Sequence, residues 1–235
     1  MALGTKDLFS ENWVGSNNFA GDGGTGTTQL NGWYTVLGSG SVINGDSTDI
    51  ADSDSGSSHI LKTQKVSPNF NARVRWRTAG DNAISYFNCF VNITAEGLSN
   101  DQQIYLMRGQ NAAYSEPWRV RLQQAGGNLK IVLIYYSGDT DQTSTWTSVP
   151  SLSTWYQIEV YYDYTNSLWA WRINGIAIES GSLTGTLRAG PRDFLLGDSD
   201  FGRTVTAYFH YVNASTNGWQ TVTASTWIPK VIMVM

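Results

Sequence analysis

The chain has 235 residues, a formal net charge of −4, a pI near 5.1 and a single cysteine. An acidic chain argues against nucleic acid as the main partner, because neutralising phosphates requires a basic face. No run is long and apolar enough for a transmembrane helix, which predicts no membrane insertion, and one cysteine excludes an internal disulfide.

Alternating apolar and polar runs recur along the chain roughly every 10–15 residues, with turn-forming residues between them, as in a β-sandwich. No window keeps the spacing of an amphipathic helix. The sequence therefore predicts an all-β chain, an antiparallel β-sandwich of the jelly-roll type. We expect one domain over residues 1–235, with 213–235 as a C-terminal strand or extension. The predicted strands are Leu30–Leu37, Ser41–Ile43, His59–Thr63, Asn71–Arg77, Ile84–Ile93, Gln102–Arg108, Trp118–Gln124, Leu129–Tyr136, Trp146–Ser148, Trp155–Asp163, Leu168–Ile173, Ile176–Glu179, Asp193–Leu196, Thr204–Val212 and Trp227–Val234.

The strictest alternation lies in the stretch Trp155–Glu179, which holds two period-two strands followed by Asn174-Gly175. Period two marks strands with one face in a core. Asn-Gly supplies the positive φ angles of a tight hairpin. In the predicted strand Ile84–Ile93, apolar neighbours indicate that Cys89 is a buried small hydrophobe rather than a reactive thiol.

Three segments carry a resemblance to a known family. The sequence TWYQIEVYYDYTNSLWAWRINGIAIE resembles the tryptophan, strand, turn, strand and Asn-Gly signature of laminin-G-like modules in the concanavalin A-like lectin/glucanase superfamily. The hairpin WRVRLQQAGGNLKIVLIYY and the opening DLFSENW look like further elements of these modules, especially on bacterial and phage proteins. His210 departs from the family, which often has an acidic residue in that strand. The resemblance covers most of the chain and implies a two-sheet jelly roll.

Groups that would carry catalysis in this superfamily are missing. Laminarinase-type members bear an E-x-D-x-(x)-E strand, whereas the matching segment Gln102–Arg108 has no acid. Glu159 and Asp163 are the nearest substitutes, and strand rise puts them about 13 Å apart, too far for an acid/nucleophile pair. Alginate-lyase-type members use Gln-Ile-His, and residues 103–105 read Gln-Ile-Tyr, without the histidine base. We therefore expect a protein that is not an enzyme, with a divergent hydrolase or lyase as the third possibility.

Candidate ligand residues lie on the strands Trp118–Gln124, Trp155–Asp163 and Leu168–Asn174. Alternation puts their charged side chains opposite the core, where we expect them to be solvated, since an unpaired buried charge is costly. Trp146 and Trp219 stand in polar, turn-like surroundings and offer rings that stack on sugars, with a structural role as the alternative. The candidate ligand-binding residues are Tyr161, Arg172, Glu159, Asp163, Arg119, Arg121, Trp146 and Trp219.

Arginines alternate along two of the predicted strands. Arg73, Arg75 and Arg77 share one face of the first, and Arg119 and Arg121 share one face of the second. A solvated sheet face is the simplest interpretation of these local basic stripes.

A candidate metal site lies in the sequence GDSTDIADSDSG, which places Asp46, Asp49, Asp52 and Asp54 within nine residues. Calcium prefers hard oxygen ligands, and carboxylates supply them. The spacing does not match an EF-hand loop, so a solvated loop is the alternative to calcium as a cofactor.

These features predict a non-catalytic carbohydrate-binding or adhesion module whose partner is a polysaccharide or other glycan. The alternative is a structural virion or subunit-interaction protein without sugar binding, whose partners are virion neighbours or further copies of the chain. The opening residues encode no signal peptide, and we favour a virion or extracellular surface over the cytoplasm. The apolar run Trp227–Met235 is expected to pack near Asp7–Val14 or against a neighbouring subunit.

Overall fold

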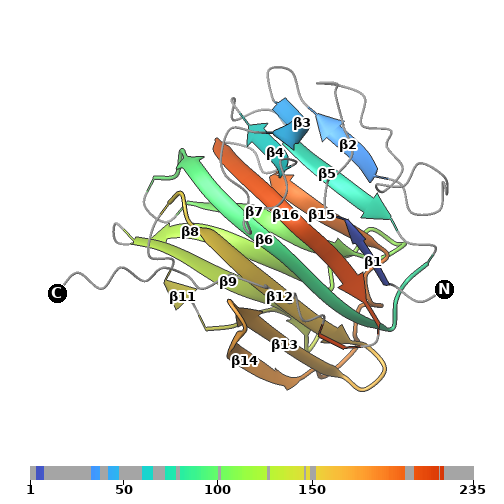
Figure 1. Cartoon of the computed structure of the whole chain (residues 1–235). Coiled ribbons are helices and arrows are strands. Elements are labelled where there is room, and N and C mark those ends of the chain that lie inside the picture. Colours follow the sequence, from blue (N-terminus) through green and yellow to red (C-terminus); the bar gives the residue numbers. More distant parts are fainter. Residues whose placement is uncertain are drawn as a thin grey trace.

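The computed structural model of the protein (Figure 1) describes residues 4–7, 33–37, 42–47, 60–65, 72–77, 80–99, 102–125, 128–145, 147–148, 152–198, 204–216 and 218–219. Within these ranges the regular structure consists of β-strands, and all of their pairings are antiparallel. The same ranges contain no helix long and apolar enough to cross a membrane. The strands form two sheets packed face to face, so the predicted antiparallel β-sandwich is confirmed.

The first sheet, sheet A, contains eight strands. These strands are β1 (Gly4–Asp7), β3 (Val42–Ser47), β4 (Ile60–Lys65), β6 (Ile84–Glu96), β12 (Trp155–Asp163), β13 (Leu168–Ile173), β14 (Ile176–Ser182) and β16 (Val205–Ser215). Their order is β14-β13-β12-β6-β16-β4-β3, with β1 also paired to β16. The long strands β6, β12 and β16 therefore form the middle of sheet A (Figure 1).

The second sheet, sheet B, also contains eight strands. These strands are β2 (Trp33–Leu37), β5 (Ala72–Arg77), β7 (Gln103–Gln110), β8 (Trp118–Ala125), β9 (Asn128–Ser137), β10 (Thr140–Thr143), β11 (Thr147–Ser148) and β15 (Asp193–Asp198). Their order is β10-β9-β8-β7-β15-β5-β2, with β11 also paired to β9. Strands β7, β8 and β15 lie in its middle.

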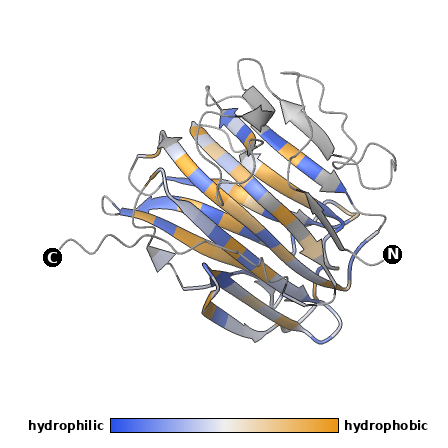
Figure 2. Ribbon diagram, viewed as in Figure 1, coloured by the Kyte–Doolittle hydropathy of each residue, from blue (hydrophilic) through white to orange (hydrophobic). Residues whose placement is uncertain are grey.

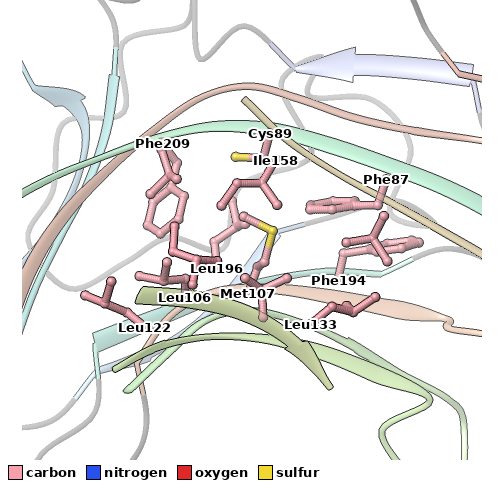
Figure 3. Close-up of a cluster of buried hydrophobic side chains, with 14 of the residues drawn as sticks. Phe87, Cys89, Leu106, Met107, Leu122, Leu133, Ile158, Phe194, Leu196 and Phe209 are labelled. Carbon is pink, nitrogen blue, oxygen red and sulfur yellow. The ribbon is translucent and has the colours of Figure 1, made fainter. Parts of the chain in front are cut away.

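The hydrophobic core lies between the two sheets. Hydropathy alternates along the central strands (Figure 2), as expected when one side of each strand faces the core. In Figure 3, Phe87, Cys89 and Phe209 of sheet A face Met107 and Phe194 of sheet B. Cys89 is fully buried, and burial raises the pKa of its thiol. The predicted burial of Cys89 is confirmed.

The β12–β13–β14 meander follows the sequence prediction closely. Strands β12 and β13 have the predicted bounds. Asn174 and Gly175 form the two-residue connection to β14 with φ angles of 53° and 75°, the positive values that a tight hairpin requires. The predicted turn is confirmed.

The N-terminal strand β1 pairs with β16, with Gly4 opposite Ser215 and Asp7 opposite Val212. The first strand thus lies beside the last described strand of the chain. The run Trp227–Met235, for which a position near Asp7–Val14 is expected, lies outside the described residues.

Candidate functional site

The predicted ligand residues fall on two different sheets. Strand β8, which carries Arg119 and Arg121, belongs to sheet B, whereas β12 and β13 belong to sheet A. Because the core separates the sheets, outward side chains of β8 and β12 point to opposite sides of the sandwich. The expectation of one binding face across these three strands is wrong. Trp146 lies outside the described residues.

On sheet A, four outward side chains form what we call the aromatic cluster: Tyr86 of β6, Tyr161 of β12, Arg172 of β13, and Trp219 from beyond β16. The rings of Tyr86 and Tyr161 stack with centroids 4.5 Å apart. Trp219 meets the Tyr86 ring edge-on at 5.2 Å, and the Arg172 guanidinium lies 4.2 Å from the Trp219 ring centroid. Three predicted residues, Tyr161, Arg172 and Trp219, are thus brought together, and Trp219 contacts both of the others.

Asp163 is the last residue of β12, and its side chain bonds to the turn that leads to β13. Its carboxylate accepts hydrogen bonds from the backbone and side-chain nitrogens of Asn166, both at 2.8 Å, and from the Tyr161 hydroxyl at 2.7 Å. Burial favours the neutral carboxyl, but the hydrogen bonds from Asn166 and Tyr161 together hold the pKa of Asp163 below its ordinary value. Asp163 is only 1% exposed, so the expectation that it is solvated is wrong.

Glu159 is also buried, with 4% of its surface exposed, although it faces away from the core. Its Oε2 atom has no hydrogen-bond partner in the described structure. Burial raises the pKa of Glu159, and the nearby Arg172 charge offsets this only in part. The expectation of a solvated carboxylate is wrong here as well.

On sheet B, Tyr105 of β7 lies at the centre of a group of guanidinium groups. The guanidinium carbons of Arg108, Arg119 and Arg121 lie 4.8, 5.5 and 4.7 Å from the Tyr105 ring centroid. The register explains the grouping, since Arg121 is directly opposite Tyr105 and Arg119 is opposite Arg108 across the β7–β8 pair. A bulge between Tyr105 and Met107 lets two consecutive residues face inward and returns Arg108 to the outer face.

Two of these arginines have carboxylate partners. The Glu116 carboxylate accepts hydrogen bonds from Arg108 at 3.0 Å and from Arg119 at 3.2 Å. The Asp141 carboxylate accepts a hydrogen bond from Arg119 at 2.5 Å. Arg121 differs, because it donates hydrogen bonds to the side-chain amide oxygen of Gln103 at 2.5 Å and to the Tyr105 hydroxyl, which are both neutral. Within the described residues Arg121 has no ion-pair partner.

More arginines flank this group. The fully buried carboxylate of Asp193 on β15 pairs with Arg77 at 2.8 Å, Arg192 at 3.4 Å and Arg75 at 3.7 Å. Arg188 stacks on Tyr136 with its guanidinium carbon 3.7 Å from the ring centroid. We call the outer side of sheet B, with the connection beside it, the arginine face; it contains Arg73, Arg75, Arg77, Arg108, Arg119, Arg121, Arg188 and Arg192.

The arginine face concentrates positive charge on an acidic protein. It holds eight of the ten arginines in the chain. Among the described residues, three carboxylates (Glu116, Asp141 and Asp193) pair with six of these arginines. The sequence predicts two separate arginine stripes, on β5 and on β8. In the structure, β15 pairs between β5 and β7 and so brings the two stripes onto one surface.

The predicted metal ligands lie mostly outside the described residues. Asp46 belongs to β3, and Asp49, Asp52 and Asp54 are not among the described positions. In the part of the chain that the structure describes, no group of three or more His, Cys, Asp or Glu side chains could hold a metal ion.

Comparisons with known proteins define the fold. No family model matches the chain, and no curated protein sequence matches it. Among solved structures, a botulinum neurotoxin serotype D binding domain is similar over 91% of this chain and 49% of its own (TM-score 0.58, 9% identity). A sialidase is similar over 86% of this chain and 18% of its own (TM-score 0.56, 10% identity). An alginate lyase from Pseudomonas aeruginosa is similar over 67% of this chain and 82% of its own (TM-score 0.51, 10% identity).

At such identities the likeness concerns the fold. The chain spans less than half the length of the matched sialidase and toxin chains. It therefore shares an antiparallel β-sandwich with domains of otherwise different proteins.

Proposed function

We propose that the protein is a non-catalytic glycan-binding module of the concanavalin A-like superfamily that binds acidic sugar chains on its arginine face. The observation that carries the proposal is the state of Arg121. Its guanidinium lies on β8, over the Tyr105 ring, with neutral hydrogen-bond partners only. A planar guanidinium matches the two oxygens of a carboxylate or sulfate, so an acidic group on a ligand would supply the missing counter-charge.

The neighbours of Arg121 suit a sugar as the carrier of that acidic group. Tyr105 contributes an aromatic ring and a hydroxyl, and Gln103 contributes an amide, on the same side of β7. Ring faces pack against the C–H groups of sugars, while hydroxyl and amide groups bond to their oxygens. One structural neighbour is named an alginate lyase, and alginate is a polymer of uronic acids. This agrees with the proposal, although the acidic ligand is inferred from the arginines.

The binding test uses affinity electrophoresis and titration calorimetry with alginate, dextran sulfate and neutral dextran. We expect binding to the two acidic polymers that weakens with added salt, because salt screens the attraction between the arginines and the acidic groups of the polymer. Arg121→Ala should lower alginate affinity on the order of tenfold or more, the loss of one charge-assisted hydrogen-bonded contact. Arg121→Lys keeps the charge without the planar fork and should be intermediate.

The matched control is Arg172→Ala. Arg172 also lacks an ion-pair partner among the described residues but belongs to sheet A. Its removal should leave alginate affinity unchanged. No binding of the wild-type chain to any acidic glycan would refute the proposal. Equal losses in the Arg121 and Arg172 variants would refute the site. Tighter binding to a nucleic acid of equal charge would reassign the face.

Binding without turnover is the second part of the proposal. The described histidine, His210, is fully buried on β16 of sheet A, and β7 carries Tyr105 where the lyases have their base. We expect no new absorbance near 235 nm from alginate and no new reducing ends. A steady rate that Tyr105→Phe abolishes would show that the protein is a lyase.

The third part is adhesion, with display on a virion or cell surface. The support is the sequence resemblance to modules of bacterial and phage proteins. The competing role, a subunit-interaction protein without sugar binding, predicts self-association in sedimentation velocity together with no retention on any glycan. Glycan retention by a monomeric chain favours adhesion.

A further inference from the structure

Tyr114 occupies an unfavourable backbone conformation without gaining burial. It lies in the loop between β7 and β8 with φ of 61°. In this left-handed region a bulky side chain crowds the backbone, and Gly or Asn is preferred. The Tyr114 side chain is nevertheless 64% exposed, so packing within the fold does not explain a tyrosine at this position.

The loop around Tyr114 is held firmly. The Asn111 side-chain oxygen accepts hydrogen bonds from the backbone N–H groups of Ala113 at 3.0 Å and Ser115 at 2.9 Å. The Asn111 backbone carbonyl accepts a hydrogen bond from the Tyr114 N–H at 3.0 Å. The carboxylate of Asp81, in the connection before β6, accepts a hydrogen bond from the Ala112 N–H at 2.7 Å. A non-favoured conformation that the surroundings fix in this way is typical of functional positions.

The same loop is joined to the arginine face on both sides. Gln110, on the outer side of β7, donates from its amide to the Tyr114 carbonyl at 3.3 Å. Glu116, two residues beyond Tyr114, binds Arg108 and Arg119. The Tyr114 backbone therefore lies beside the arginine face, and its side chain is exposed.

We infer that Tyr114 is a ligand-binding residue that stacks on the apolar face of a sugar ring at the end of the arginine face. The inference rests on the proposed function and adds a contact of different chemistry. The arginines would bind the acidic groups of the chain, and Tyr114 would bind the C–H face of a neighbouring residue. A rigid aromatic ring held in solvent loses little entropy on binding.

The test compares Tyr114→Asn and Tyr114→Phe with the wild-type chain. Asn tolerates the left-handed conformation, so Tyr114→Asn should fold with an equal or higher melting temperature. It should nevertheless bind alginate oligosaccharides on the order of tenfold more weakly, as for loss of an aromatic anchor. Tyr114→Phe keeps the ring and should retain wild-type affinity.

A second ligand separates stacking from charge. Polyacrylate has carboxylates but no sugar rings, so its affinity should fall in Arg121→Ala and stay unchanged in Tyr114→Asn. If the wild-type chain binds alginate and Tyr114→Asn binds it equally well, the role of Tyr114 is refuted and the arginine face stands. If the wild-type chain binds neither polymer, both proposals fail. A lowered melting temperature in Tyr114→Asn would show that the ring is structural.

Discussion

Glu159 and Arg172 are direct cross-strand neighbours in the β12–β13 pair, yet they form no ion pair, because the guanidinium stacks on Trp219 instead. The carboxyl is left buried, with one oxygen lacking a hydrogen-bond partner in the described structure. A buried carboxylate without a close counter-charge destabilises the folded state. The pKa of Glu159 is accordingly raised from its ordinary value of 4.5. Burial is the largest cause and raises the pKa, whereas the charge of Arg172 lowers it by a smaller amount.

The first prediction is that Glu159→Gln stabilises the protein near neutral pH. A raised folded-state pKa means that the stabilising contribution of the protonated group is full below 4.5. This contribution is lost as the pH rises through the folded-state pKa. We expect Glu159→Gln to melt above the wild-type chain at about pH 7 and equally at about pH 4, measured by scanning calorimetry. A lower melting temperature for the variant at pH 7 would show that the carboxylate is stabilised by a partner.

The second prediction concerns Asp163, whose pKa is shifted in the opposite direction. Burial raises this pKa, but the hydrogen bonds from Asn166 and Tyr161 together leave it below the ordinary value of 3.8. Asp163→Asn should cost about 1.5–3 kcal/mol of unfolding free energy at neutral pH. The stability that the carboxylate provides is present above 3.8 and lost as the pH falls through the folded-state pKa.

Urea unfolding at about pH 7 and about pH 3 measures this difference, which should shrink in acid. Asp139→Asn is the matched control, because Asp139 lies in the exposed β9–β10 turn and accepts a single 3.3 Å hydrogen bond from Thr186. Equal costs for the two substitutions would contradict the turn-stabilising role of Asp163.

The third prediction concerns Gly190, where two backbone segments approach closely. A Cβ atom at Gly190 would lie 1.7 Å from the carbonyl oxygen of Asn82. The Asn82 backbone and side chain also donate to the Pro191 carbonyl, at 3.2 and 2.6 Å, so the segments cannot separate without losing these bonds. Gly190→Ala should therefore destabilise by about 3 kcal/mol or more.

Gly80→Ala is the control for Gly190→Ala. A Cβ atom at Gly80 meets nothing within 4 Å, so this substitution should leave stability nearly unchanged or raise it by about 0.4–1 kcal/mol. Chemical denaturation of the two variants tests the pair. Similar unfolding free energies of the two variants would show that the Asn82–Gly190 contact gives way easily.

The sequence predicts the bounds of single strands far better than it predicts which strands lie beside one another in a sheet. Period-two alternation over Trp155–Ile173 is local, and it yields the bounds of β12 and β13. Strand β10 was missed because TDQT is polar and mostly exposed, so no apolar face marks it. Alternation also shows which residues share a face of one strand, but not which sheet the strand joins. The prediction of one binding site was therefore wrong, because it joined Arg119 and Arg121 to residues of the other sheet.

The alternation of a single strand also does not show whether an outward side chain is buried or exposed. Glu159 and Asp163 alternate correctly with core residues, yet other parts of the protein decide their exposure. Tyr105 and Arg108 were missed as site residues because the bulge on β7 breaks the alternation between them. The signal that could have found the arginine face is the recurrence of arginine on two separate strands, Ala72–Arg77 and Trp118–Ala125.

The fourth prediction is calcium binding by Asp46, Asp49, Asp52 and Asp54. Four carboxylates within nine residues repel one another without a cation. Metal that binds only the folded chain would stabilise it by about 2.7 kcal/mol at a hundredfold excess over Kd, which raises the melting temperature by a few degrees. Melting with millimolar calcium and with chelator measures the effect, and Asp49→Asn should reduce it. Superimposable curves would exclude this site.

The fifth prediction separates the aromatic cluster from the arginine face. Trp219 contacts the rings of Tyr86 and Tyr161 and the guanidinium of Arg172, all on sheet A. Such ring contacts contribute about 0.5–1.5 kcal/mol each, and a cation–π contact about 0.5–2 kcal/mol. Trp219→Ala should therefore cost about 1–3 kcal/mol of stability. It should leave alginate affinity unchanged, because the proposed ligand binds the opposite sheet.

Denaturant unfolding and alginate titration of Trp219→Ala, measured beside Arg121→Ala, test this separation. The expected result is a crossed pattern, in which the Trp219 variant loses stability and the Arg121 variant loses affinity. If Trp219→Ala instead loses alginate affinity at unchanged stability, the aromatic cluster is the sugar-binding site. Tyr161, Arg172 and Trp219 would then be ligand residues, as the sequence predicts, and the arginine face would need another role.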